Sequence, residues 1–270
     1  MSLALSAETL QSSVAEQSSA LGAPRPPRLA HPKCLIIIPA RNEGDSIGRL
    51  IDRLQRSLPD MDVLVVDDGS TDATARQAAN KSRTLSLPFN LGIGGAMQTG
   101  YRYADLNGYD IAIQVDGDGQ HRPCEVLKLV ETVLCGKADL AVGSRFLGQQ
   151  RFYRQKPMRV IGSTILRYML RCLTGQHVTD CTSGFRAVNS KVIRAFAHWY
   201  PEDYPEPEVI LLLHRAGYHV TEVPVRMRQR RTGASSISGL KGVFYVMKVS
   251  LCLLLDLARR PWDNAKVNGR

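Results

Sequence analysis

The sequence has few aromatic side chains and no apolar run long enough to span a membrane. Phe, Trp and Tyr make up only 6% of the 270 residues, whereas proteins that read nucleic acid rely on aromatic stacking positions or a recognisable reader motif. A spanning helix needs about 20 consecutive apolar residues, and the longest apolar run near the C-terminus is far shorter. We therefore expect no nucleic-acid partner and no spanning helix, although the formal charge of +10 favours some other anionic partner.

The sequence also contains no C-x-x-C motif and no signal-peptide pattern. The six cysteines include no C-x-x-C and show no metal-ligand spacing, so a reducing, cytosolic location fits best. Residues 1–32 are rich in Ser, Ala and Pro and lack the basic-then-apolar order of a signal peptide. We expect this segment to be a disordered extension.

Acidic residues are absent from two long stretches, one between Asp139 and Asp180 and the other from Val223 to Leu255. Helix faces that are merely solvated usually mix charges of both signs, so the two stretches predict surfaces that bind an anion. Their basic residues include Arg145, Arg151, Arg154, Lys156, Arg159, Arg167, Arg171, Arg226, Arg228, Arg230, Arg231, Lys241 and Lys248.

Short apolar runs alternate with helical patterns along the chain. The runs at 34–38, 63–66 and 111–115 are typical of parallel strands covered on both faces. Strand–helix alternation implies right-handed crossovers and a mostly parallel sheet with helices on both faces, so we expect one α/β domain over 33–238. Further strands are expected at 140–143 and 219–225, a loop at 179–187, and helices at 45–58, 72–80, 94–107, 123–135, 159–173, 191–198 and 206–216.

The last segment, 239–270, contains an amphipathic helical pattern with basic residues on one side. Such a helix can lie in a membrane interface. Packing on the protein's own core or in a dimer explains the same pattern, so the alternatives stay open. The apolar face consists of Leu240, Val243, Phe244, Met247, Leu251, Leu254 and Leu255.

Each of the first three strands is followed by acidic residues, and the third is followed by a D-x-D. Two aspartates two positions apart occur in many loops, but here they directly follow a buried strand. Alternate side chains of an extended segment point the same way, so Asp116, Asp118 and Gln120 can converge on one Mg²⁺ or Mn²⁺. The ion would offset the charge that grows on a departing diphosphate.

The earlier acidic residues suit a nucleoside. Asp68 could accept a hydrogen bond from a base N–H, and Glu43 could bind ribose hydroxyls, while Ser70 or Thr71 caps the next helix. The run from Asn90 to Gly95 resembles a dinucleotide fingerprint, but Met97 occupies its third glycine position, which argues against hydride transfer. Its glycines are expected to let a helix N-terminus approach the nucleotide.

Taken in order, the motifs resemble family 2 glycosyltransferases with the GT-A fold, of the polyprenyl-phosphate type to which the dolichyl-phosphate mannose synthases belong. The likeness covers about residues 33–240. Its motifs are Pro39-Ala40-x-Asn42-Glu43, Asp67-Asp68-Gly69-Ser70-x-Asp72, Asn90-x-Gly92, Asp116-x-Asp118-x-Gln120-His121, Gly143-Ser144-Arg145, Asp180-x-Thr182-Ser183-Gly184-Phe185-Arg186 and Arg230-x-x-Gly233-x-Ser235-Ser236.

The resemblance implies a role for each matching residue. The metal ligands are Asp116, Asp118 and Gln120. The donor nucleotide is bound by Pro39, Arg41, Glu43, Asp67, Asp68, Asn90, Gly95, Asp116 and Arg230, the last on a mobile loop that closes over the diphosphate. The acceptor phosphate is held by Arg145, Arg159 and Ser163, and the catalytic residues are Asp118, Asp180 and Arg145.

The implied reaction is metal-dependent, inverting transfer of a sugar from a UDP- or GDP-linked donor to a polyprenyl phosphate. A phosphate has a second pKa of about 6, so no strong general base is required. The acid-free basic stretches and the basic amphipathic pattern predict a peripheral location at the anionic cytosolic face of the membrane, with a small membrane partner protein or a homodimer as further options. The alternative is transfer to a saccharide or small-molecule hydroxyl, with Asp180 or Glu208 as base.

Overall fold

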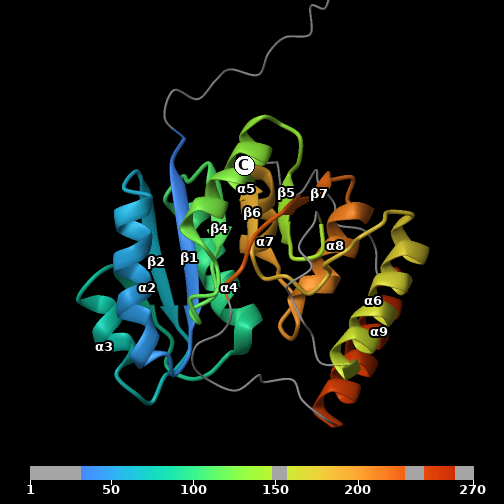
Figure 1. The fold of residues 1–270 in the computed structure, drawn as a ribbon, viewed down its shortest axis with the longest axis horizontal. Helices are drawn as coiled ribbons and strands as arrows, with labels where there is room; N and C mark the ends of the chain where they lie inside the picture. Colours follow the sequence, from blue (N-terminus) through green and yellow to red (C-terminus); the bar gives the residue numbers. More distant parts are fainter. Residues whose placement is uncertain (1–31, 148–156, 229–239, 259–270) are drawn as a thin grey trace, which may run out of the picture. The chain divides into compact units, whose positions relative to one another are not determined.

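A seven-stranded sheet organises the computed structural model, which describes residues 32–147, 157–228 and 240–258 (Figure 1). The strand order is β3-β2-β1-β4-β6-β5-β7. The predicted N-terminal extension, Arg230 and most of the C-terminal tail lie outside the described residues. The strands are β1 (Cys34–Ala40), β2 (Met61–Asp67), β3 (Arg83–Ser86), β4 (Ile111–Gln114), β5 (Leu140–Ser144), β6 (Arg186–Asn189) and β7 (Val220–Pro224).

The parallel sheet expected from the sequence is confirmed, with one strand reversed. β1 pairs in parallel with β2 and β4, and β5 pairs in parallel with β7. β6 runs antiparallel between β4 and β5. The prediction of a loop over 179–187 was therefore wrong for its last two residues, which belong to β6. A strand of four residues is too short to show a strand pattern in the sequence. The edge strand β3 was missed for the same reason.

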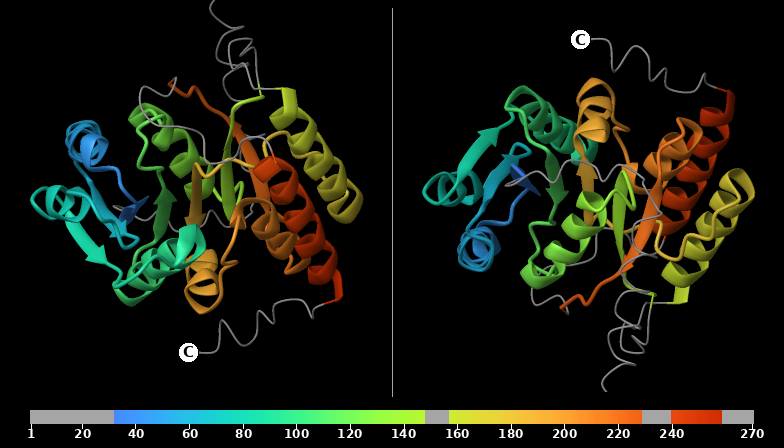
Figure 2. Two further views of the ribbon diagram at one scale, coloured as in Figure 1. Left: turned by 90° about the horizontal axis from the view of Figure 1, so that it is seen from below. Right: turned by 90° about the horizontal axis from the view of Figure 1, so that it is seen from above.

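Helices cover both faces of the sheet, as predicted (Figure 2). Side chains alternate along β1, so Ile36 and Ile38 pack on one face while Leu35 and Ile37 pack on the other. The first face is covered by α2 (Gly44–Ser57), α3 (Thr74–Ala79) and α5 (Pro123–Leu134). The second is covered by α4 (Gly92–Leu106), α7 (Ser190–His198) and α8 (Pro205–Arg215).

The helices α6 (Pro157–Thr174) and α9 (Leu240–Ala258) lie side by side and pack with α8 (Figures 1 and 2). Leu166, Tyr245 and Leu253 belong to the buried cluster that they share. The predicted apolar face of α9 does not pack there, since Phe244 and Met247 are 63% and 66% exposed. The helix therefore has two apolar sides, and the described residues cover only one of them. No helix within the described ranges is long and apolar enough to cross a membrane.

Candidate active site

The loops that follow β1, β2 and β4 meet at one edge of the sheet. Asn42 Oδ1 accepts a hydrogen bond from Thr71 N at 2.9 Å, and Ser70 Oγ accepts one from Asn42 N at 3.0 Å. Ser46 Oγ lies 2.7 Å from Glu43 Oε2 and 3.3 Å from Gly117 O, so the Glu43 loop contacts the turn after β4. Neighbouring parallel strands bring their carboxyl ends together, and this edge is where open α/β sheets bind ligands.

The three predicted metal ligands lie on a turn after β4, and not on the extended segment expected from the sequence. Asp116, Asp118 and Gln120 are all partly exposed, and Asp118 Oδ1 accepts a hydrogen bond from Gln120 N at 3.0 Å. Two carboxylates and an amide oxygen suit Mg²⁺ or Mn²⁺, which retain water and substrate oxygens as further ligands. Groups of three or more His, Cys, Asp or Glu side chains placed to hold a metal do not occur among the described residues. The residues present thus fit a cation that shares its coordination with a ligand.

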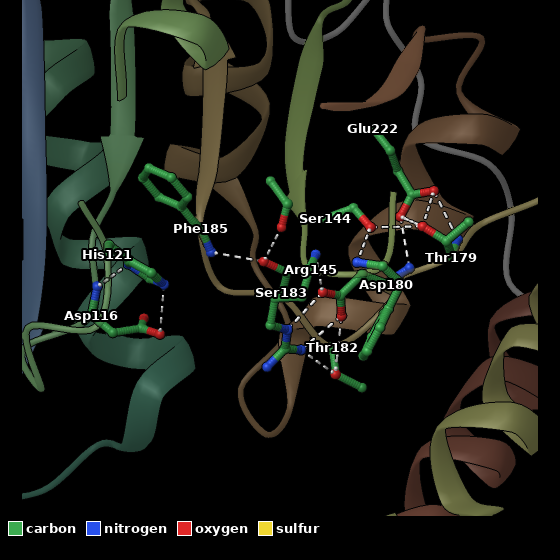
Figure 3. A network of polar contacts seen from close by, with 12 residues as sticks. Asp116, His121, Ser144, Arg145, Thr179, Asp180, Thr182, Ser183, Phe185 and Glu222 are labelled. Atoms are coloured by element: carbon green, nitrogen blue, oxygen red, sulfur yellow. Dashed lines mark hydrogen bonds and ion pairs between the residues drawn. The ribbon is translucent and has the colours of Figure 1, made fainter. Parts of the chain in front are cut away.

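His121 contacts the first of these aspartates and was given no role from the sequence. Its Nδ1 accepts a hydrogen bond from Asp116 N at 3.1 Å, and its Nε2 lies 3.6 Å from Asp116 Oδ2 (Figure 3). Because Nδ1 accepts, the proton of the neutral ring is on Nε2, which faces the carboxylate. The ring is buried and stacks on Phe185, with centroids 4.4 Å apart.

Gly184 contacts Asp116 from the other side. A Cβ atom at Gly184 would lie 2.8 Å from Asp116 Oδ1 and 2.9 Å from Gln114 Nε2, closer than real Cβ contacts allow. The β6 segment therefore approaches the acidic turn closely only because residue 184 has no side chain. The sequence indicated Gly184 as part of a motif but not this reason for it.

The two aspartates at the end of β2, Asp67 and Asp68, are buried and already hydrogen-bonded. Asp68 accepts from Leu91 N at 2.6 Å and from Gly92 N at 3.0 Å, and so holds the start of α4. Asp67 Oδ1 accepts from Ser70 N at 3.3 Å. A carboxylate at a helix N-terminus satisfies backbone donors that would otherwise lack partners. Both side chains thus shape the predicted nucleoside pocket, and direct contact with a base stays a prediction.

Gly94 has a packing role that the sequence did not indicate. A Cβ atom there would lie 2.1 Å from Pro201 O and 2.2 Å from Glu202 O, and Gly94 N donates to Glu202 O at 3.0 Å. Its missing side chain lets α4 pack on the 201–202 segment. Pro39 and Gly95 are partly exposed and Arg41 and Asn90 are exposed at the same edge of the sheet.

A second polar cluster lies at the end of β5. Arg145 donates through Nε to Asp180 Oδ2 and through Nη2 to Asp180 Oδ1, each at 2.7 Å, and its backbone N donates to Oδ2 at 3.0 Å (Figure 3). Arg145 Nη2 also donates to Thr182 Oγ1 at 3.0 Å. Asp180 is 1% exposed. Such a buried two-point pair fixes the guanidinium in one orientation.

These contacts disfavour Asp180 as a general base. Its carboxylate is buried and accepts three hydrogen bonds from Arg145, so an acceptor hydroxyl would have to displace the arginine. Glu208 is also buried, and it is hydrogen-bonded to the Cys252 thiol. The pKa of Cys252 is raised mainly by burial of the thiol and secondly by Glu208. Glu208 therefore faces α9 and not the acidic turn.

Glu206, in the first turn of α8, was missed by sequence reasoning. Burial raises the pKa of its carboxyl, Arg186 opposes the shift, and Asp116 and Arg145 are near enough to act on it too. Arg186 Nη2 donates to Glu206 O at 2.7 Å. No sequence motif distinguishes Glu206 from Glu208, although burial raises the pKa of the first and the second hydrogen-bonds Cys252.

Of the three predicted acceptor residues, the structure describes the side-chain contacts of Arg145 and Ser163 and only the backbone of Arg159. Ser163 Oγ donates to Val160 O of its own helix at 3.0 Å, and Arg145 donates hydrogen bonds to Asp180 and Thr182. Among the described contacts these two residues are not joined. Arg159 lies in the first turn of α6, where the structure describes only its backbone. Arg230 lies outside the described residues.

Comparison with known proteins gives three kinds of match. The family model described as "Glycosyl transferase family 2" matches residues 35–196. An undecaprenyl-phosphate mannosyltransferase of Micrococcus luteus is 32% identical over 77% of this chain and 88% of its own length. A polyprenol monophosphomannose synthase of Mycolicibacterium smegmatis is 30% identical over 88% of this chain and 95% of its own. Glucosyl-3-phosphoglycerate synthase of Mycobacterium tuberculosis superposes with a TM-score of 0.64 at 23% identity, covering 84% of this chain and 80% of that chain.

Proposed function

Because the chain belongs to glycosyl transferase family 2, we propose that it transfers a sugar from a nucleoside-diphosphate sugar to a polyprenyl phosphate. It has the GT-A fold expected from the sequence. The names of the two bacterial relatives support a polyprenyl acceptor. The observation that carries the proposal is that an oxygen-rich turn and a buried, oriented arginine lie on adjoining parts of one sheet edge, bridged by the Phe185 segment.

The metal-binding role falls to Asp116, Asp118 and Gln120. A Mg²⁺ or Mn²⁺ ion held there would neutralise charge on the leaving diphosphate. The structures of the glucosyl-3-phosphoglycerate synthase contain UDP with Mn²⁺ or with Mg²⁺, which supports a divalent cation in this fold. His121 and Gly184 keep Asp116 in place from two sides.

The nucleoside pocket is formed by the loops after β1 and β2 and by the start of α4. Glu43 is partly exposed there and suits ribose hydroxyls, while Asp68 holds the backbone of Leu91 and Gly92 in position. The remaining donor ligands in this proposal are Pro39, Arg41, Asp67, Gly95 and Arg230. Arg228, two residues before Arg230, donates its backbone N–H to Gln120 O at 2.8 Å, which supports a diphosphate role for the segment that follows.

In the proposed reaction, an oxygen of the acceptor phosphate attacks the anomeric carbon. The bond from that carbon to the diphosphate oxygen breaks on the opposite face, so the configuration inverts and the electron pair leaves with the nucleoside diphosphate. An ionised phosphate carries no proton that must be removed. Arg145 then orients the acceptor with Arg159 and Ser163, and Asp180 holds Arg145.

A lipid acceptor also accounts for the exposed sides of α6 and α9. The exposed apolar residues are Val160, Ile161, Ile165 and Tyr168 on α6, and Val243, Phe244, Met247, Leu251, Leu254, Leu255 and Leu257 on α9. The only acidic residue of either helix is Asp256, which is buried. Apolar side chains without exposed acidic neighbours suit an anionic bilayer surface, so we place the membrane contact here, at the cytosolic face. A homodimer or a small membrane partner protein would be the other occupants of this surface.

The decisive experiment is a donor panel of UDP- and GDP-sugars with Mg²⁺ or Mn²⁺. The acceptors are a short polyprenyl phosphate and the polyprenol of the same chain length, which differ only in the phosphate. We expect sugar on the phosphate and little on the alcohol. Equal transfer to the alcohol would replace the proposal with the hydroxyl-acceptor alternative.

The same assay tests the metal ligands. Asp118→Ala should abolish transfer and cation-dependent donor binding while leaving the fold intact, because its carboxylate is partly exposed. Glu131→Gln, at an exposed position on α5, is the matched control. Full wild-type activity in EDTA would contradict the metal assignment.

A further inference from the structure

Glu222 on β7 accepts hydrogen bonds from two consecutive residues beside Arg145. Its Oε2 accepts from Thr179 N and its Oε1 from Asp180 N, both at 2.7 Å (Figure 3). Thr179 Oγ1 lies 3.0 Å from both carboxylate oxygens. One carboxylate therefore fixes the backbone and side chain of the segment that carries Asp180.

The direction of these hydrogen bonds is set by Glu222. An ionised carboxylate only accepts, so the Thr179 hydroxyl donates its one proton to it. Ser144 Oγ, 2.7 Å from Thr179 Oγ1, must then be the donor in that contact, and it accepts in turn from Phe146 N at 3.2 Å. The chain from Phe146 to Glu222 ties the end of β5 to β7, on both sides of Arg145. Chains of aligned hydrogen bonds reinforce one another.

A packing role does not explain a glutamate at this position. Glu222 is paired with Val142 in the parallel register of β5 and β7, and a β-branched residue would suit such a strand. This carboxylate is instead directed at three donors, and removing a carboxylate from water is costly unless its contacts compensate.

We propose that Glu222 is a positioning residue for acceptor binding, which holds Asp180 and Ser144 so that the Arg145 guanidinium keeps the orientation needed to bind a phosphate. This inference rests on the proposed function, because it assumes that Arg145 contacts the acceptor. Glu222 would itself touch neither substrate. Its effect should appear in acceptor recognition and spare the donor.

The test compares Glu222→Gln with Glu131→Gln, which makes the same change at an exposed site. An amide supplies one acceptor oxygen in place of two and turns an NH₂ group toward a backbone N–H. The free energy of a hydrogen bond to a charged group corresponds to a factor of about ten or more in an equilibrium constant. If its loss releases the Arg145 guanidinium, Glu222→Gln should raise the KM for polyprenyl phosphate about tenfold. The KM for the donor should change little, whereas the unfolding midpoint should fall, because the same hydrogen bonds contribute to folding stability.

Thr179 provides a conservative rescue. Thr179→Val removes the hydroxyl that links Ser144 to Glu222 and should raise the acceptor KM, whereas Thr179→Ser keeps the hydroxyl and should restore it to within about twofold. Equal losses for donor and acceptor, in proportion to the folded fraction, would reduce Glu222 to a purely structural residue and overturn the proposal.

A readout independent of activity separates this inference from the proposed function. The Arg145 Nε–H NMR signal, assigned by its loss in Arg145→Lys, should be shifted and exchange faster with solvent in Glu222→Gln. If the wild-type protein fails to glycosylate polyprenyl phosphate while this signal still responds, the function is wrong and the positioning role stands. An unchanged Arg145 signal together with an unchanged acceptor KM would overturn the positioning role itself.

Discussion

At the scale of single residues, Asp116 depends on neighbours that are distant in sequence. The backbone N–H of Asp116 donates to His121, whose ring faces the Asp116 carboxylate. Gly184, just before β6, lies against the other carboxylate oxygen. Both contacts restrict where the carboxylate can point. The geometry of the proposed metal site is therefore set partly by residues that bind no metal.

Gly184→Ala tests this dependence. The added methyl group would overlap Asp116 Oδ1 and Gln114 Nε2, and because a displacement of about 1 Å can cost about 100-fold in rate, we expect a loss of that order in kcat/KM. The control is Gly48→Ala in α2, where the nearest contacts are at an ordinary 3.4–3.5 Å, and where alanine should stabilise the helix by up to about 1 kcal/mol. Steady-state kinetics and thermal unfolding provide the measurements, and full activity of Gly184→Ala would contradict the crowding argument.

The cysteines offer a second prediction at this scale. Burial, with a smaller effect of Asp110, raises the pKa of Cys34 to about 11, and burial, with a smaller effect of Asp180, raises that of Cys181 to about 12. The thiolate is the reactive form, so both should resist alkylation at pH 8. Cys124, Cys135 and Cys172 are exposed and should be labelled in the native protein. Peptide mass spectrometry after brief iodoacetamide treatment checks this, with labelling in denaturant as the control.

At the scale of elements, α9 is the most informative helix because it has two apolar sides. Adjacent residues belong to different sides, since Leu253 is fully buried and Leu254 is 53% exposed. Leu253→Ala should lower the free energy of unfolding by about 2–5 kcal/mol because it leaves a cavity. Leu254→Ala should change it by no more than about 0.5 kcal/mol. Urea denaturation of both variants measures the contrast, and similar losses would show that the assignment of the two sides is wrong.

At the scale of the whole molecule, the basic charge and the exposed sides of α6 and α9 predict binding to anionic membranes. Each large apolar side chain moved out of water contributes about 1.5–3 kcal/mol, so changing Phe244, Met247 and Leu251 together to Ser should weaken liposome binding at least about 100-fold. Binding should also fall with salt, because exposed charges are screened. Co-sedimentation with vesicles containing anionic lipid measures both effects.

The control for that experiment changes three exposed apolar residues elsewhere, Leu106, Leu127 and Leu134, to Ser. This triple variant should bind vesicles as the wild type does. Activity toward a water-soluble short-chain polyprenyl phosphate should survive in both variants. If the α9 variant binds vesicles normally but no longer forms a dimer in light scattering, the surface joins two copies of the chain and the membrane placement is wrong.

The sequence by itself determined the α/β class, the parallel core strands and the residues that gather at their carboxyl ends. The reason is local: apolar runs of strand length, helical periodicity and acidic residues at strand ends can all be read within a few neighbouring positions. Glu43, Asp68 and Asp116 were predicted to meet, and their loops do so because β1, β2 and β4 are adjacent parallel strands.

Only the tertiary structure decided what depends on contacts between distant segments. The reversed strand β6 brings Gly184 against Asp116, and the pairing of β5 with β7 brings Glu222 to Asp180. A four-residue strand has no period to detect, and a carboxylate acquires its role from donors more than 40 positions away. The same holds for α9, whose amphipathic pattern predicted a helix but could not show which apolar side the rest of the chain would cover.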